Sequence, residues 1–227
     1  MCLHGGGWVF GDLETADTPA RRVCEHLRAT VVSVDYRLAP EHRHPAPLSD
    51  CLAALRWAAE RAGGDRIVGG DSAGGGLAAG CAAARPRLGT APARAAAPLP
   101  RARPDDDSVA ENADGTFLTR ADMSWFYERY LPEPGLRSDP SVALLVCEEL
   151  DDLPPAVIAV AELDPLRDEG VAHADALRRA GVDVRLLRGE GLVHGFFGLA
   201  AASAAVRAEG DRALDALAEL LSSRPRD

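Results

Sequence analysis

Ser72 stands in the segment Gly70-Asp71-Ser72-Ala73-Gly74, a G-x-S-x-G pattern between a short apolar run and a stretch rich in alanine and glycine. A serine in this pattern, at the junction of a strand and a helix, is typical of a nucleophile exposed on a tight, strained turn. The flanking glycines let neighbouring backbone approach without Cβ clashes, and the N-terminus of the helix directs its amides toward the site. The alternative is a chance match in an alanine- and glycine-rich sequence, which the strand–turn–helix context disfavours.

A second candidate motif, His4-Gly5-Gly6-Gly7, follows the short apolar stretch Met1–Leu3. Consecutive glycines can present their amide N–H groups to an oxygen that gains negative charge, where side chains would block the approach. The alternative is a flexible glycine turn at a frayed terminus. We expect His4 to hold the glycine loop in place rather than to act on a substrate.

Other titratable residues near these motifs have structural explanations. Asp71 adjoins the serine but is expected to anchor the turn through hydrogen bonds. Asp168 and Glu169 open an expected helix, where acidic side chains favour the positive end of the helix dipole. His42 and His44 lie in a proline-rich loop without a third metal ligand. We therefore expect no metal ion and no cofactor.

Length and composition limit the class of protein. The 227 residues are 47% hydrophobic, which is enough for one core and predicts a single domain over 1–227. The formal net charge of −10 argues against a nucleic-acid or anionic-membrane partner. No apolar run has the length of a membrane span, residues 1–20 do not resemble a signal peptide, and five widely spaced cysteines form no disulfide framework. We expect a cytoplasmic protein without an integral membrane segment, and the oligomeric state is left open.

The elements that must position the motifs alternate between strands and helices. Apolar runs of strand length occur at 30–34, 66–69, 156–161 and 182–187. Helices are expected at about 18–28, 48–62, 76–85, 119–130, 168–180 and 201–221, with Thr18-Pro19 as the start of the first. This alternation predicts an α/β fold with a mostly parallel sheet and right-handed crossovers.

Six motifs in chain order resemble those of the hormone-sensitive-lipase-like branch of the α/β-hydrolases, which includes many bacterial carboxylesterases. Together they span residues 4–198. They are His4–Trp8, Asp35–Glu41 (DYRLAPE), Gly70–Gly75, Ser108–Leu118 (SVAENADGTFL), Asp164–Gly170 (DPLRDEG) and His194-Gly195-Phe196. The resemblance implies the α/β-hydrolase fold and a serine hydrolase that cleaves short- to medium-chain carboxylic esters through an acyl-enzyme intermediate.

Carried over position by position, the resemblance makes Ser72 the nucleophile, Asp164 the acid of the catalytic triad and His194 the general base. The order Ser…Asp…His is the one expected for this fold. Asp164 and His194 each follow an expected strand, and the carboxyl ends of strands are where open α/β sheets place their sites. The resemblance also implies a small-molecule ester as the partner.

The remaining site residues are implied by the same motifs. The oxyanion hole is expected from the amides of Gly6, Gly7 and Ala73. Residues 108–140 are expected to form a lid or pocket wall within the domain. The substrate pocket is expected to include Trp8, Trp125, Phe126 and Phe196. For the aromatic helix that carries Trp125 and Phe126, the alternative is a core role.

Two stretches depart from the family. The family has a substantial region before the glycine motif, whereas His4 is the fourth residue here, so we expect a truncated N-terminal part and a small lid remnant. Arg85–Pro104 holds five arginines, five prolines and no valine or isoleucine, where the family has a buried apolar strand. Because proline cannot donate to a sheet ladder and unpaired arginine resists burial, we expect no central strand there. A shifted reading frame and a genuine proline-rich surface loop both fit this composition.

These departures keep two alternatives to the enzyme open. One is a ligand-binding relative that retains the fold without catalysis. The other is a truncated, inactive gene product. The presence of all three triad residues favours the enzyme.

Overall fold

The computed structural model describes residues 1–61, 63, 66–88, 93–96, 106–115, 117–139, 142 and 150–222. These residues form a six-stranded sheet with the strand order β2-β1-β3-β4-β5-β6, in which every neighbouring pair is parallel. The strands are β1 (Cys2–Leu3), β2 (Ser33–Val34), β3 (Arg66–Gly70), β4 (Ala93–Ala96), β5 (Ala156–Leu163) and β6 (Val184–Val193). The predicted α/β fold with a parallel sheet is therefore confirmed.

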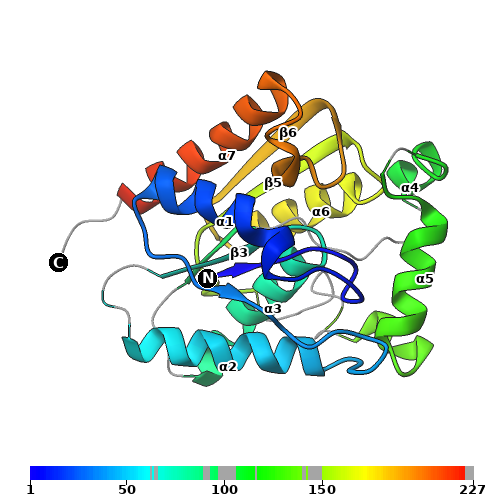
Figure 1. The fold of residues 1–227 in the computed structure, drawn as a ribbon, viewed down its shortest axis with the longest axis horizontal. Helices are drawn as coiled ribbons and strands as arrows, with labels where there is room; N and C mark the ends of the chain where they lie inside the picture. The colour runs from blue at the N-terminus through cyan, green and yellow to red at the C-terminus, as the bar shows by residue number, and fades with distance from the viewer. Residues whose placement is uncertain are drawn as a thin grey trace.

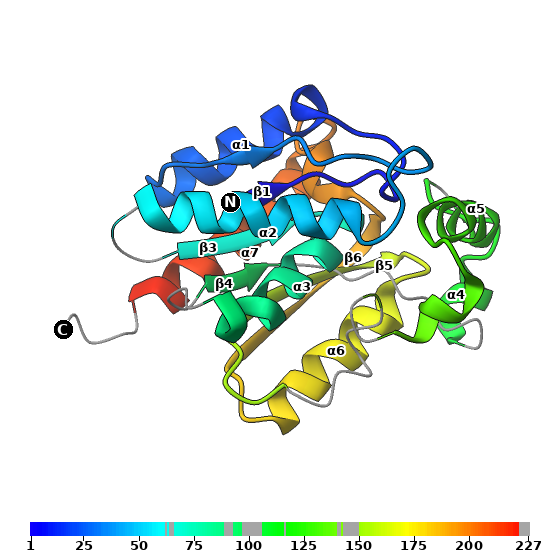
Figure 2. The ribbon, with the colours of Figure 1, turned by 90° about the horizontal axis from the view of Figure 1, so that it is seen from below.

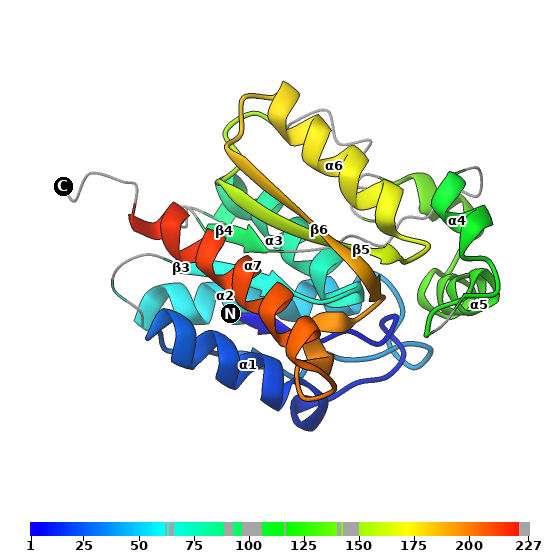
Figure 3. The same cartoon turned by 90° about the horizontal axis from the view of Figure 1, so that it is seen from above.

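Helices cover both faces of the sheet. Figure 3 shows α1 (Leu13–Leu27) and α7 (Ala204–Ser222) together on one face. Figure 2 shows the opposite face, covered by α2 (Ala46–Arg61), α3 (Ala73–Leu88) and α6 (Arg167–Arg179). This two-sided cover follows from parallel strands, because each crossover must pass over one face to reach the next strand.

A smaller group of helices lies at one end of the molecule, beyond the carboxyl ends of the strands (Figure 1). It consists of α4 (Asp107–Glu111), α5 (Arg120–Tyr130) and the 3₁₀ helix η1 (Pro134–Ser138). Thr119 caps α5, because its hydroxyl accepts from the Asp122 amide while the Asp122 carboxylate accepts from the Thr119 amide. All three elements fall within the segment 108–140, except for the first residue of α4.

The start of α1 differs from the sequence-based expectation. The helix begins five residues before Thr18, because Asp12 caps it by accepting from the Thr15 amide at 2.8 Å. The Thr15 hydroxyl in turn accepts from the Asp12 amide at 2.9 Å, which completes a capping box. Pro19 lies inside the helix. Proline was the stronger local signal in the sequence, but reciprocal capping fixes the helix start.

β4 corrects the expectation for Arg85–Pro104. Ala93–Ala96 pairs with β3 on one side and with β5 on the other, so a central strand is present. The paired segment is only four residues long and falls between Pro92 and Pro98, so no proline enters the ladder. Arg85–Leu88 continue α3, and the rest of the stretch lies outside the described residues.

The core divides along the sheet. One cluster surrounds β1 and β3 and joins them to α2, α3 and α5, with Leu3 and Val68 at its centre. A second cluster joins the start of β5 to α6, around Ile158. In the part of the chain that is described, no helix is long and apolar enough to cross a membrane.

Candidate active site

Ser72 lies at the sharp turn between β3 and α3, as the sequence predicted. Its φ of 54° falls in the left-handed region, which is uncommon for a residue with a Cβ. The amide of Gly74 donates to the Asp71 carbonyl at 2.9 Å, and the amide of Gly75 donates to the Ser72 carbonyl at 2.8 Å. These bonds hold the strained conformation in place.

The two glycines that flank Ser72 are required by close backbone contacts with β1. A Cβ on Gly70 would lie 2.4 Å from the Leu3 carbonyl oxygen, and a Cβ on Gly74 would lie 2.1 Å from the same atom. Real Cβ atoms do not approach backbone this closely. The G-x-S-x-G spacing therefore lets the serine turn pack directly on the end of β1.

Ser72, His194 and Asp164 are brought together by the ends of three different segments. Nε2 of His194 lies 2.8 Å from Oγ of Ser72, and Nδ1 of His194 lies 2.8 Å from Oδ2 of Asp164. Asp164 follows β5, and His194 follows β6. Oδ1 of Asp164 accepts from the Leu166 amide at 2.8 Å, which fixes the carboxylate. This geometry lets the imidazole donate to Asp164 through Nδ1 and accept a hydrogen bond from the Ser72 hydroxyl through Nε2.

The surroundings of His194 favour its charged form. Burial opposes the imidazolium, since the side chain is almost completely enclosed, but the hydrogen bond and charge of Asp164 outweigh it. The charge of Asp71 acts in the same direction, and together these groups raise the pKa of His194. A base whose charged form is stabilised in this way can take a proton from the serine.

The glycine loop runs beside the serine turn. A Cβ on Gly5 would lie 3.4 Å from Cβ of Ser72. Gly6 has a φ of 105° and Gly7 a φ of 59°, conformations that glycine adopts readily. Among the described residues, no backbone carbonyl accepts from the amides of these two glycines. Ala73 is the first residue of α3, so its amide has no acceptor within the helix.

His4 supports this loop from the core side. Its ring is stacked on Tyr36, with centroids 4.1 Å apart, and its Nδ1–H donates to the Gly5 carbonyl at 2.7 Å. The Tyr36 hydroxyl donates to the His4 carbonyl at 2.7 Å. Burial lowers the pKa of His4. A buried, neutral ring with these contacts fits a supporting role.

The four aromatic residues expected in the pocket occupy different environments. Trp8 is 5% exposed and stacks on Tyr130 with centroids 4.2 Å apart. Phe196 is also buried, in a cluster with Ala161 and Leu192. The structure thus buries Trp8 and Phe196 among apolar neighbours.

Phe126 and Trp125 are more accessible. The Phe126 ring packs against the glycine loop so closely that a Cβ on Gly7 would lie 2.2 Å from it. Trp125 lies farther out, 41% exposed, with the Arg129 guanidinium 3.8 Å from the centre of its ring. Of the four, Phe126 therefore has the position best suited to contact a substrate.

Two exposed phenylalanines near the site were not anticipated. Phe10 is 57% exposed, and its ring centroid lies 5.4 Å from that of Phe126. Phe117 is 65% exposed, and its ring edge lies 3.8 Å from where a Cβ on Gly195 would be. The available signal was their position: Phe10 closes the glycine-rich loop, and Phe117 lies in the motif 108–118. Exposed apolar side chains beside reactive loops are typical of binding surfaces.

The other titratable candidates have structural partners. Oδ2 of Asp168 accepts from the Ser108 amide at 2.8 Å, and Asp168 also pairs with Arg167. Glu169 is buried within α6. Within the described ranges, no group of three or more His, Cys, Asp or Glu side chains is arranged to hold a metal ion.

Comparison with known proteins agrees with this geometry. A family model described as the α/β hydrolase fold matches residues 1–198. Esterase LipI of Mycobacterium tuberculosis (strain ATCC 25618 / H37Rv) is 43% identical over 231 residues, covering 97% of this chain and 72% of LipI. Carboxylic ester hydrolase LipN of the same organism is 41% identical over 212 residues, covering 86% of this chain. The alignment spans only 56% of the length of LipN.

Solved structures give the same result. The crystal structure of a thermostable esterase from Pseudomonas putida ECU1011 superposes with a TM-score of 0.90 at 34% identity, covering 98% of this chain and 74% of that one. These similarities agree with the sequence motifs, with the parallel sheet and with the geometry of the site. The chain belongs to the α/β hydrolase family, in the hormone-sensitive-lipase-like branch whose relatives are carboxylic ester hydrolases.

Proposed function

We propose that this chain is a serine hydrolase that cleaves carboxylic esters, with Ser72 as nucleophile, His194 as general base and Asp164 as the group that orients His194. The observation that carries the proposal is the continuous chain of two 2.8 Å contacts from Ser72 through His194 to Asp164. A serine hydroxyl is a weak nucleophile at neutral pH, so it needs a base in direct contact.

The residues divide the reaction between them. Oγ of Ser72 attacks the ester carbonyl carbon while its proton passes to Nε2 of His194. The carbonyl oxygen becomes negative, and the amides of Gly6, Gly7 and Ala73 donate to it. His194 then gives its proton to the departing alcohol, which leaves an acyl group on Ser72. Water, deprotonated by His194, releases the acid in a second round of the same steps.

Short- to medium-chain acyl or alcohol groups fit the surroundings of the site. Phe10 and Phe126 form an apolar pair beside the glycine loop, and the segment 108–140 carries Phe117 and Phe126. We assign this segment the role of a pocket wall. Its aromatic side chains supply apolar contact for a chain bound next to Ser72.

Pre-steady-state hydrolysis of p-nitrophenyl butyrate tests the proposal. A burst of p-nitrophenol equal to the concentration of protein is expected if the acyl-enzyme accumulates, and Ser72→Ala is expected to lower turnover at least about 1000-fold. Ser49→Ala, at an exposed position of α2, is the matched control and should retain turnover. Full activity of Ser72→Ala, with its circular dichroism spectrum unchanged, would exclude Ser72 as nucleophile.

A further inference from the structure

A cavity of about 360 Å³ lies between the sheet and the two helices α1 and α7. An engineered apolar cavity of about 150 Å³ is enough to hold one benzene molecule. The cavity in this chain is therefore large enough for a longer apolar ligand. Among the residues described, neither Ser72 nor His194 lines it, but Gly6 and Phe10 beside the ester site do, so the cavity adjoins that site and extends from it toward α1 and α7.

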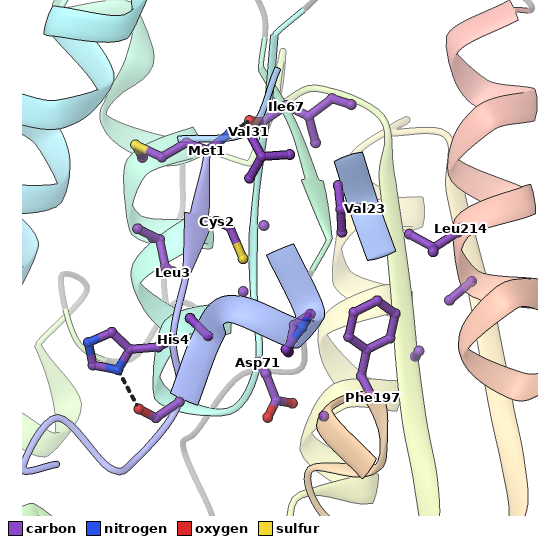
Figure 4. Close-up of a pocket in the computed structure, with 18 of the residues that line it drawn as sticks. Met1, Cys2, Leu3, His4, Val23, Val31, Ile67, Asp71, Phe197 and Leu214 are labelled. Carbon is purple, nitrogen blue, oxygen red and sulfur yellow. Dashed lines mark hydrogen bonds between the residues drawn. The ribbon is translucent and has the colours of Figure 1, made fainter. Parts of the chain in front are cut away.

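The walls of the cavity are apolar. Figure 4 shows Val31 and Ile67 on the strand side, Val23 of α1 and Leu214 of α7 on the helix side, with Phe197 below them. Val23 and Ile67 line the cavity, and both are only half-buried. Helix α1 therefore stands off the sheet here and leaves apolar surface that a ligand would cover.

The carboxyl group of Asp71 lies at the end of the cavity nearest Ser72 (Figure 4). Oδ2 of Asp71 lies 3.4 Å from where a Cβ on Gly5 would be and 3.7 Å from where a Cβ on Gly195 would be. The carboxyl thus sits between the glycine loop and the loop that carries His194. Burial raises the pKa of Asp71; the nearby charge of His194 opposes this effect and that of Asp164 adds to it.

The ligand must combine an apolar body with one polar group that meets Asp71. A carboxylate would be repelled by Asp71 and Asp164. An ammonium ion would lose its hydration in a mostly apolar cavity. A hydroxyl group can donate to an ionised carboxyl or accept from a protonated one. We propose that this cavity binds a medium-chain primary alcohol, with its alkyl chain between α1 and the sheet and its hydroxyl at the Asp71 carboxyl.

Calorimetric titration with 1-octanol tests this site, supported by the dependence of Tm on 1-octanol concentration. The titration uses both the parent chain and Ser72→Ala, so that binding is measured whether or not the chain hydrolyses esters. Saturable binding and a rising Tm are expected in both. Octanoate and octylammonium, which have the same chain length, are expected to bind at least tenfold more weakly.

Two substitutions fill the cavity from different helices. Val23→Phe on α1 and Ala213→Leu on α7 each add volume at a lining residue, and each is expected to weaken 1-octanol binding at least tenfold. Cys24→Phe introduces the same ring one position along α1, where the side chain is exposed and outside the cavity, and should leave binding unchanged. Circular dichroism identifies any variant that fails to fold. If one cavity-filling variant fails, 1-octanol binding to the other one tests the proposal.

Three results would overturn the proposal. The first is the absence of saturable 1-octanol binding to the parent chain. The second is equal affinity of 1-octanol for the parent chain and a folded, cavity-filled variant. The third is tighter binding of octanoate or octylammonium than of 1-octanol, which would show that the head group is charged.

Discussion

At Gly74, the first turn of α3 passes over the end of β1, with the Leu3 carbonyl oxygen only 2.1 Å from the position of a Cβ. Gly74→Ala must therefore push the serine turn away from the strand. We expect a loss of about 3 kcal/mol in the free energy of unfolding and at least a 100-fold loss of kcat/KM. Urea unfolding and ester hydrolysis measure the two effects.

Gly63→Ala is the matched control for this substitution. A Cβ on Gly63 meets no atom within 4 Å, and its φ lies outside the left-handed region. Stability and activity should stay close to those of the parent chain. Equal stability of Gly74→Ala and Gly63→Ala would show that the contact with β1 is not restrictive.

The pH dependence of hydrolysis follows from His194. Only the neutral imidazole accepts the serine proton, so kcat/KM rises with pH through the pKa of this residue in the free protein. The unperturbed value is about 6.5, and Asp164 and Asp71 raise the pKa despite burial. The midpoint of the kcat/KM profile is therefore expected above about pH 6.5. A midpoint at or below this value would contradict the electrostatic role of the two carboxylates.

Asp71→Asn tests one of these carboxylates separately. The substitution keeps the size of the side chain but removes its charge, so the imidazolium loses stabilisation and the midpoint is expected to move to lower pH. Glu190→Gln removes a charge from an exposed position on β6 and serves as the control. Its profile should match that of the parent chain, since solvent screens an exposed charge.

At the scale of elements, Arg22 connects α1 to helix α7 and to the short helix that follows His194. Its guanidinium donates to the Phe197 carbonyl at 3.1 Å, to the Arg207 carbonyl at 3.2 Å and to Asp211 at 2.8 Å. It also lies 4.8 Å from the centre of the Phe197 ring. Phe197 belongs to the 3₁₀ helix η3 (Phe196–Leu199), which follows His194 almost directly, so α1 helps to hold the loop that carries His194.

Arg22→Ala is expected to lower Tm by about 4–8 °C, since charge-assisted hydrogen bonds of this kind contribute about 2 kcal/mol. It is also expected to lower kcat/KM about tenfold, because η3 loses its anchor. Thermal unfolding and hydrolysis rates measure both. Arg21→Ala removes an exposed helical ion pair with Asp17 and should change neither. A parent-like Tm for Arg22→Ala would exclude the anchoring role.

Several elements could be predicted from the sequence because their signals are local. The apolar run at β5 and the glycines around Ser72 each specify their own structure, and the resemblance to the hormone-sensitive-lipase-like hydrolases implied that Ser72, Asp164 and His194 meet in one site. The start of α1 and the presence of β4 could not be read in this way. The first depends on reciprocal bonds between Asp12 and Thr15, and the second depends on two neighbouring strands that pair with a segment of low strand propensity.

In the site, too, some features could be predicted from the sequence and others could not. The roles of the triad residues stay predictions until variants are measured, although their side chains meet as expected. The positions of Trp8 and Phe196 could not be predicted, because an aromatic residue beside a catalytic motif can face either the core or the pocket. The accessible positions of Phe10 and Phe117 depend on loop conformations, including a φ of 84° at Phe117.

At the scale of the whole molecule, β4 joins the two halves of the sheet. β3 precedes Ser72 and β5 precedes Asp164, and within the described residues these two strands are linked in the sheet only through β4. The separation between Ser72 and Asp164 therefore depends on the four residues of β4. This makes β4 the place where a backbone change should affect both stability and activity.

Ala95→Pro tests this dependence. Proline removes the amide of a residue that pairs with Val68 on one side and Ala156 on the other, so a ladder hydrogen bond is lost. A loss of about 1–3 kcal/mol in the free energy of unfolding is expected, together with lower kcat/KM. Ala95→Ser keeps the amide and is the control. Parent-like unfolding of Ala95→Pro would show that this pairing contributes nothing to the sheet.

The long chain separation within the triad has a kinetic consequence. Ser72 and His194 are 122 residues apart in sequence yet 2.8 Å apart in space. Contacts between distant residues close large loops and form slowly during folding. An early folding intermediate that contains the serine turn, β1 and β3 would not yet have His194 next to Ser72. During refolding, hydrolytic activity should therefore return only when β6 joins the sheet, after most of the helical circular dichroism signal has recovered.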